Sequence, residues 1–156
     1  MFSTASGENG AHAEGVGTKA YGKNGAHAEG NGTEASGENG AHAEGYQTKA
    51  KWFASHAEGY KAEASGTSAH AEGTETFAKH HYSHTEGQGT VTNGLHQHVQ
   101  GKFNDYTSDE SKNMAHIVGG GSSDTDRNNI HTLDWSGNAW FSGNVTIGED
   151  KKQLAT

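Results

Sequence analysis

The chain has 156 residues, a formal net charge of −8 and no cysteine, and only 29% of its residues are hydrophobic. This composition excludes disulfide bonds and an ordinary core of large aliphatic side chains. With 19 acidic and 11 basic residues, nucleic acid is not an expected partner, and no apolar run is long enough for membrane insertion. The first residues carry no secretory signal pattern. Such a chain gains stability by stacking short repeats and by burying area between chains.

A tetrapeptide repeat, His-Ala-Glu-Gly with two variants, runs through the first two thirds of the chain. Successive copies begin 15 residues apart at first and 14 residues apart later. The extra residue of the early copies falls in an Asn-Gly pair, a turn signal because both residues accept positive φ. The copies begin at His12, His27, His42, His56, His70, His84 and His98.

A period of about 14 residues is too short for helical repeats, which need about 33 residues or more. It predicts a β-solenoid of seven coils, each with two strands of about five residues, stacked at about 4.8 Å. Because side chains alternate along a strand, Ala11, Ala13 and Gly15 are expected inside the first coil, and His12 and Glu14 outside. The second strand of each coil repeats this arrangement, with small residues inside.

The two outward columns of side chains differ in how much they vary. On the second strand the column changes from coil to coil, as in Lys19, Glu34 and Lys49, which is typical of a solvated face. On the first strand the column stays His and Glu. A fixed outward column indicates contact with a partner that repeats in the same register, and the simplest such partner is another copy of the chain.

The small–x–small–x–Gly strands, in AHAEG and TKAYG, resemble the head repeats of YadA-like trimeric adhesins, also called Hep/Hag repeats. The resemblance implies that residues 1–101 form a left-handed parallel β-roll, with three chains intertwined or side by side. The usual repeat has aliphatic residues where this chain has His and Glu, so the homotrimer contact is expected to be polar. The residues expected at this interface are His12, Glu14, His27, Glu29, His42, Glu44, His56, Glu58, His70, Glu72, His84, Glu86 and His98.

The segment AHIVGGGSSDTDRNNIHTLDWSGNAWFSGNVTIG is similar to a segment of phage tail-fibre and tail-spike proteins of Gram-positive hosts. Residues 102–148 are therefore expected to form a C-terminal β cap, and residues 149–156 a tail. TLDWSGNAWF predicts a hairpin that turns at residues 136–138. Its packing residues are expected to be Leu133, Trp135, Trp140 and Phe141, in contact across chains.

Several motifs suit metal ions, and each has a simpler explanation. A column of His and Glu suits Zn²⁺ or Ni²⁺, but metal sites rarely repeat in one short chain, whereas a ladder of His–Glu hydrogen bonds requires repetition. Such a ladder should tolerate mild acid until the carboxylates lose their charge near pH ~4.3. His96 and His98 fit one strand face, while Asp124 and Asp126 resemble a calcium loop without its Gly and Glu. No metal and no cofactor is predicted.

No nucleophile elbow, metalloprotease motif or pair of catalytic carboxylates is present, so the chain is not expected to be an enzyme. The two resemblances indicate a structural and adhesive segment of a trimeric phage tail fibre that contacts a host-surface glycan or protein. The alternatives are the head of a trimeric autotransporter adhesin on the bacterial outer surface, and a non-catalytic part of a depolymerising tail spike. The aromatic residues expected to serve adhesion are Tyr46, Trp52, Phe53, Tyr60 and Phe77.

Overall fold

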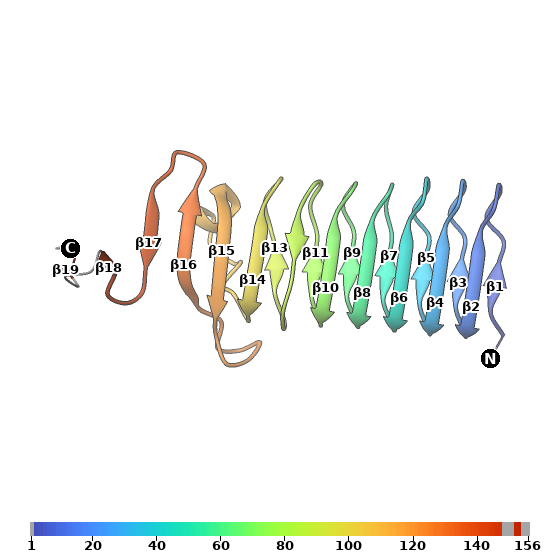
Figure 1. Ribbon diagram of the computed structural model, residues 1–156, viewed down its shortest axis with the longest axis horizontal. Helices are drawn as coiled ribbons and strands as arrows, with labels where there is room; N and C mark the ends of the chain where they lie inside the picture. The colour runs from blue at the N-terminus through green and yellow to red at the C-terminus, as the bar shows by residue number, and fades with distance from the viewer. Residues whose placement is uncertain (1, 148–151, 154–156) are drawn as a thin grey trace.

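The computed structural model describes residues 2–147 and 152–153, so most of the predicted tail at residues 149–156 lies outside the described part. The chain is a parallel β-solenoid of about eight turns, with coils of about 15 residues (Figure 1). Apart from η1, a 3-10 helix at Glu110–Asn113, the described elements are strands. None of the described residues forms a helix long and apolar enough to cross a membrane. The all-β class and the solenoid predicted from the sequence are confirmed.

Each coil contributes one strand to each of two parallel sheets that run along the solenoid (Figure 1). The long-strand sheet contains β2 (His12–Val16), β4 (His27–Asn31), β6 (His42–Tyr46), β8 (His56–Tyr60), β10 (His70–Thr74), β12 (His84–Thr85), β14 (His98–Lys102) and β15 (Met114–Gly120). The short-strand sheet contains β1 (Thr4–Ala5), β3 (Lys19–Ala20), β5 (Glu34–Ala35), β7 (Lys49–Ala50), β9 (Glu63–Ala64), β11 (Phe77–Ala78) and β13 (Val91–Thr92).

The second strand of each coil has two residues rather than the predicted five. The reason lies in the residues that follow the buried alanine. The backbone N–H groups of Tyr21 and Gly22 both donate to the carbonyl of Ala35, at 2.9 and 3.2 Å. Two successive amides that share one acceptor end a ladder, because in a regular strand only alternate amides point to the same neighbour. The chain therefore turns immediately after the alanine.

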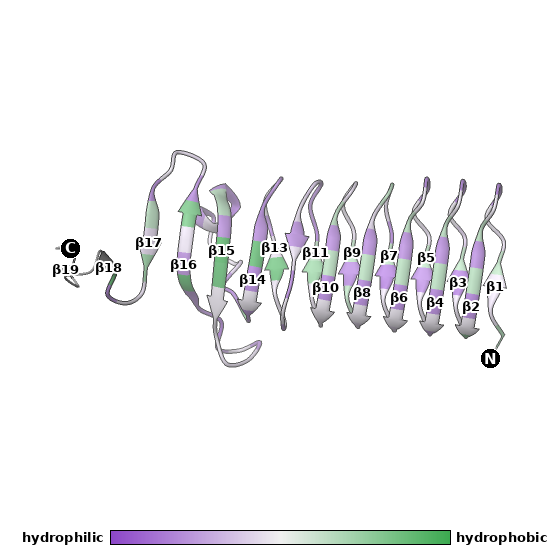
Figure 2. Ribbon diagram, in the orientation of Figure 1, coloured by the Kyte–Doolittle hydropathy of each residue, from purple (hydrophilic) through white to green (hydrophobic). Residues whose placement is uncertain are grey.

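Small side chains fill the space between the two sheets. In the long-strand sheet, Ala28, Ala43, Ala57 and Ala71 are fully buried, and they alternate with the polar residues seen as bands in Figure 2. The short-strand sheet contributes further fully buried alanines and threonines. The predicted inward alanine column is confirmed, since only small side chains fit between strands that lie this close.

The glycine at the fourth position of the five-residue long strands does not point inward as predicted. Gly30 is exposed and has a φ of 109°, in the region that favours glycine. A Cβ atom there would lie 2.1 Å from the carbonyl oxygen of Gly45 on the next coil. Glycine is needed at this position because neighbouring coils approach each other through their backbones. The predicted Asn-Gly turns are confirmed, with positive φ at Asn24 (60°) and Gly25 (87°).

The parallel stack continues beyond residue 101. β15 pairs in parallel with β14, and His116 is the register partner of His98, so β15 forms an eighth rung of the long-strand sheet. β16 (Asn129–Asp134) and β17 (Ala139–Phe141) then extend the same sheet as antiparallel strands. They form the predicted hairpin. Beyond them, β18 (Thr146–Ile147) pairs with β19 (Lys152–Gln153).

Candidate functional site

The outward face of the long-strand sheet carries a continuous stack of imidazole rings, which we call the His column. The parallel register places each His beside the His of the next coil. From His27 to His98, neighbouring ring centroids lie 4.7–4.9 Å apart and the ring planes differ by 2–9°. At the first step, between His12 and His27, the rings are turned by 80°. The solenoid therefore converts a sequence repeat into a row of aromatic rings.

The stack extends past the last predicted member. The ring of His116 lies 5.1 Å from that of His98, His131 lies 5.4 Å from His116, and Phe141 lies 4.5 Å from His131. The spacing of 18 residues between His98 and His116 hides this relation in the sequence. A signal was present, because residues 116–119 repeat the His-x-x-Gly pattern. The hairpin adds His131 and Phe141 to the stack, and neither residue belongs to a copy of the repeat.

The expected His–Glu hydrogen bonds are mostly absent within the described chain. His27 Nε2 lies 3.4 Å from Glu29 Oε2, and the same pair within the coils of His12, His42 and His56 is 3.5–3.8 Å apart. His84 Nε2 instead lies 3.7 Å from Glu72 Oε1 of the preceding coil. A hydrogen bond forms at His98, whose Nε2 lies 3.2 Å from Glu86 Oε1. Buried Nε2 atoms that have no hydrogen-bond partner among the described residues belong to His27, His42, His56, His70 and His84.

Carboxylates repeat beside the His column, which places like charges next to each other. Glu58 and Glu72 are register partners on neighbouring strands. The pKa of Glu72 is raised, chiefly by a side-chain hydrogen bond with Glu58, and burial raises it further. Like charges directly opposite each other destabilise a sheet. These repeated glutamates, called here the Glu column, therefore destabilise the sheet unless a cation, a proton or a hydrogen-bond donor binds to their carboxylates.

In the short-strand sheet, basic and acidic residues alternate from coil to coil. Lys19 lies beside Glu34, Glu34 beside Lys49, and Lys49 beside Glu63. Lys51 Nζ forms an ion pair with Glu63 Oε1 at 2.8 Å. Opposite charges in neighbouring register positions stabilise a sheet by roughly 0.2–1 kcal/mol per pair. This face satisfies its own charges, whereas the His and Glu columns do not.

Burial lowers the pKa of several imidazoles in the column. For His70, the neighbouring His56 and His84 lower the pKa further. Burial also lowers the pKa of His84 and of His116, and the adjacent His98 acts in the same direction on both. The folded chain therefore favours the neutral form of these rings.

Acid is expected to weaken a chain whose His column is not covered by a partner as the pH falls below about 6.5, the pKa of an unperturbed histidine. Because the folded pKa values of His70, His84 and His116 are lowered, the unfolded chain binds protons first, and stability is lost as the pH falls toward the folded pKa. The Tm should be lower at pH 5.5 than at pH 7.5, and replacing the three histidines by Asn should reduce the difference. Equal Tm values at the two pH values would contradict this expectation. A complete ladder of His–Glu hydrogen bonds, as expected from the sequence, would instead tolerate mild acid.

The two pairs of metal candidates lie in different surroundings from those expected. His96 precedes β14 in a turn with a φ of 56°, and its ring stacks on Tyr82 at 4.9 Å, whereas His98 stacks in the His column. They do not share a strand face, because the strand begins only at His98. The calcium-like candidates lie in a polar turn, where Asp124 pairs with Arg127 at 2.5 Å and Asp126 accepts a hydrogen bond from a serine hydroxyl.

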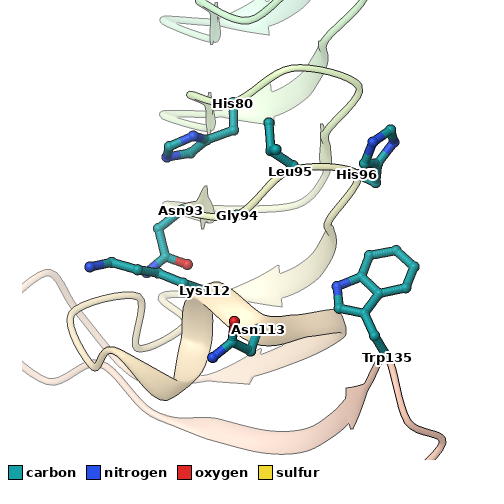
Figure 3. A pocket seen from close by; sticks show the side chains of 8 residues that line it. All are labelled: His80, Asn93, Gly94, Leu95, His96, Lys112, Asn113 and Trp135. Atoms are coloured by element: carbon teal, nitrogen blue, oxygen red, sulfur yellow. The ribbon is translucent and has the colours of Figure 1, made fainter.

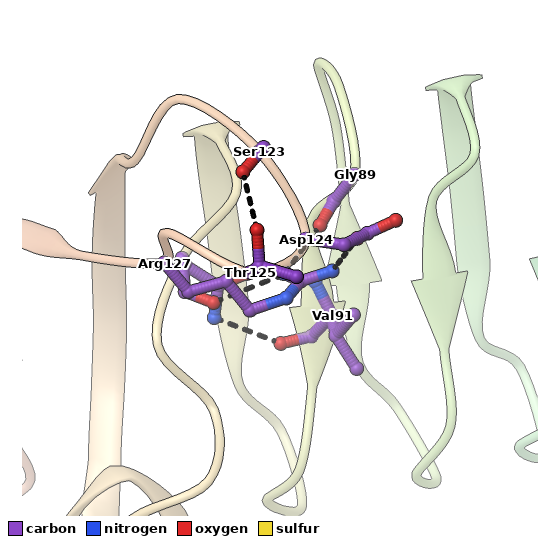
Figure 4. A network of polar contacts seen from close by, with 7 residues as sticks. Gly89, Val91, Ser123, Asp124, Thr125 and Arg127 are labelled. Atoms are coloured by element: carbon purple, nitrogen blue, oxygen red, sulfur yellow. Dashed lines mark hydrogen bonds and ion pairs between the residues drawn. The ribbon is translucent and has the colours of Figure 1, made fainter.

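The same turn fastens the C-terminal part to the solenoid. The Arg127 guanidinium donates to the carbonyl oxygen of Gly89 at 2.8 Å (Figure 4). It also donates to the carbonyl oxygen of Asn104 at 3.2 Å. Asn104 is fully buried, and its side chain donates to the carbonyl of Val91 at 3.0 Å. These bonds join the polar residues of this turn to the last coils of the solenoid.

Three of the four predicted packing residues of the hairpin are exposed in the single chain. The exposed fractions are 60% for Trp135, 52% for Trp140 and 46% for Phe141, while Leu133 is half-buried. Trp135 lines a pocket of about 590 Å³ together with His80, Leu95 and others (Figure 3). The chain by itself does not bury these aromatic residues, and their packing across chains stays a prediction.

No protein family, curated protein or solved structure matches the chain.

Proposed function

We propose that the chain is a structural and adhesive segment of a homotrimeric fibre, most simply a phage tail fibre outside the cell. The observation that carries this proposal is the contrast between the two sheets. The short-strand sheet pairs opposite charges within the chain, whereas the long-strand sheet repeats like charges and leaves buried Nε2 atoms without partners. A second copy in the same register supplies imidazole donors for the Glu column and carboxylate acceptors for the His column.

The composition of the core supports the same proposal. The buried hydrophobic residues are alanines, with Val91, Val99 and Ile117 in addition. Burying an alanine removes little apolar area from water, and hydrophobic stabilisation scales with that area. A thin solenoid of this kind gains stability when neighbouring chains cover its faces. The exposed Trp135, Trp140 and Phe141 are available for such contacts.

The adhesive part of the proposal rests on aromatic side chains along the rod. Tyr46 and Tyr60 stack at 5.3 Å on neighbouring coils, and the Nζ of Lys61 lies 5.0 Å from the ring centre of Tyr60. Trp52 and Phe53 are about half exposed. Aromatic faces beside polar groups suit a sugar ring or a protein loop. Three such surfaces on one rod gain avidity through effective concentration.

A solution mass of about three times the 16.4 kDa of one chain is the expected result of multi-angle light scattering after size-exclusion chromatography. Replacing His56 and Glu58 by Ala should shift the mass toward the monomer, because both belong to the proposed contact. Replacing Lys49 and Lys51 by Ala on the other sheet provides the matched control and should leave the trimer intact. A monomeric wild-type chain would refute the proposal.

The alternative origin, the head of a bacterial autotransporter adhesin, shares the same trimeric rod. The full-length gene and its neighbours distinguish the two, because tail genes lie beside the gene of a phage fibre, whereas an autotransporter has its membrane anchor in the same polypeptide. A non-catalytic part of a depolymerising tail spike is a third origin with the same architecture.

A further inference from the structure

Consecutive coils of the long-strand sheet form four similar three-residue clusters. Each contains two histidines of neighbouring coils and the glutamate of the first, and in each the three ligand atoms lie within 4.8 Å of one another. The clusters, numbered here as triads 1 to 4, are His27–Glu29–His42, His42–Glu44–His56, His56–Glu58–His70 and His70–Glu72–His84.

The imidazole nitrogens of these triads lack hydrogen-bond partners among the described residues. The Nε2 atoms of all five histidines are buried and accept or donate no hydrogen bond among the described residues. The carboxylates of neighbouring triads lie side by side in the register, as Glu44 and Glu58 do, so negative charge accumulates along the row. The His42 and Glu44 side chains are 30% and 39% exposed, so the triads lie at the surface of the chain, and a ring must turn before its buried Nε2 atom meets an ion from solvent.

From these contacts we infer that the triads bind divalent transition-metal ions, with Zn²⁺ as the representative ion. Two imidazoles and one carboxylate are a zinc ligand set, in which the fourth tetrahedral position is open to water or to a carboxylate of a neighbouring chain. At an occupied triad the ion therefore takes the place of the imidazole–carboxylate hydrogen bonds proposed between chains. A positive ion also offsets the row of carboxylates. Oxygen-seeking Ca²⁺ and Mg²⁺ do not suit a set with two nitrogen ligands.

Binding requires a small movement of the rings. Ligands 2.0–2.1 Å from a tetrahedral zinc ion lie about 3.4 Å apart, so atoms up to 4.8 Å apart must converge. Parallel stacked rings direct their Nε2 lone pairs side by side, and one ring of each pair must turn to meet the ion. Such a turn fits the column, because the ring planes of His12 and His27 already differ by 80° at a spacing of 4.9 Å.

The overlap of the triads sets the number of ions. Triads 1 and 2 share His42, triads 2 and 3 share His56, and triads 3 and 4 share His70. Since one Nε2 atom binds one ion, neighbouring triads exclude each other, and alternate triads are filled. The chain therefore binds two ions rather than four. The repetition of the site follows from the parallel register, which reproduces the same three atoms at every rung.

Equilibrium dialysis of the metal-free chain against Zn²⁺, followed by elemental analysis, should give two ions per chain, and Co²⁺ should produce the absorption bands of tetrahedral coordination. Ca²⁺ and Mg²⁺ should not bind. Replacing His42 and His70 by Asn removes a ligand from every triad and should abolish binding. The matched control replaces His12 and His98, which lie in the same column outside the triads, and should keep two ions.

A second pair of variants tests the sharing of ligands. Glu29→Gln with Glu58→Gln leaves triads 2 and 4, which share no residue, so two ions should remain. Glu58→Gln with Glu72→Gln leaves triads 1 and 2, which share His42, so one ion should remain. Equal losses in all variants would show that His-rich surfaces bind ions unspecifically, and would overturn the inference, as would an absence of binding by the wild-type chain.

The light-scattering mass of the metal-free chain separates this inference from the proposed function. A trimer that binds no Zn²⁺ would overturn the metal site alone. A monomer that binds two ions would refute the trimer and leave the metal site standing, because the triads lie within one chain.

Discussion

Replacing Gly59 by Ala should destabilise the solenoid by about 3–5 kcal/mol, a range reached when a substitution combines a steric clash with an unfavourable backbone conformation. The Cβ atom of an alanine would lie 2.3 Å from the carbonyl oxygen of Gly73 on the next coil, so the two coils would have to separate. The φ of 104° adds a conformational cost that only glycine avoids. Urea unfolding followed by circular dichroism measures the loss.

Gly40→Ala is the matched control for this prediction. Gly40 has a φ of 80°, but a Cβ atom there would meet nothing within 4 Å. Its substitution should cost only about 1–2 kcal/mol, the conformational penalty of a left-handed residue. Both variants should be compared with the wild type at one protein concentration, because assembly makes the stability concentration-dependent. Equal losses would show that close backbone approach does not determine where glycine is required.

Ala57→Leu should cost about 3 kcal/mol or more, because overpacking a core strains both side chains and backbone. Ala57 is fully buried, and its register partners Ala43 and Ala71 leave no room above or below it. The same inward column holds larger residues further along the chain, where Val99 and Ile117 are also fully buried. The last coils therefore accommodate larger inward side chains, and the cost of a large residue depends on the coil. The Tm and the urea midpoint should both fall.

Thr85→Val tests the same column without a change of size. The Thr85 hydroxyl is buried and has no hydrogen-bond partner among the described residues. Removing an unsatisfied buried polar group should raise stability by about 1 kcal/mol. A loss of stability in this variant would contradict the lack of a partner for the Thr85 hydroxyl. An Ala57→Leu chain as stable as the wild type would contradict the tight packing of the coil interior.

The sequence by itself determined the period, the inward alanine column and the outward His and Glu columns. These features follow from local rules. Side chains alternate along any strand, Asn and Gly accept the positive φ of a tight turn, as at Asn24 and Gly25, and a core between close strands admits only small residues such as Ala57. A repeat strengthens these weak local signals, because the same sequence pattern recurs in every coil.

The tertiary structure decided how neighbouring coils meet. The second strand ends after two residues because two amides share one carbonyl of the next coil. Gly59 is fixed by the backbone of Gly73, fourteen residues away, rather than by its own strand face. His116 joins the His column through its pairing with β14, although an insertion of irregular length separates it from His98. Such contacts depend on register and spacing between coils, which no single repeat contains.

For the His column, too, the sequence determined one part of the chemistry and the tertiary structure determined the other. The sequence placed His and Glu on one outward face, and that much requires only the period of a strand. Only the structure showed that the Nε2 atoms of His42 and His56 are buried without partners, and that each lies within reach of a carboxylate and a second ring. The distance between ligand atoms is set by the stacking of one coil on the next. This stacking, rather than the motif, determines whether a repeated His and Glu form a hydrogen-bonded ladder or a row of sites for an ion.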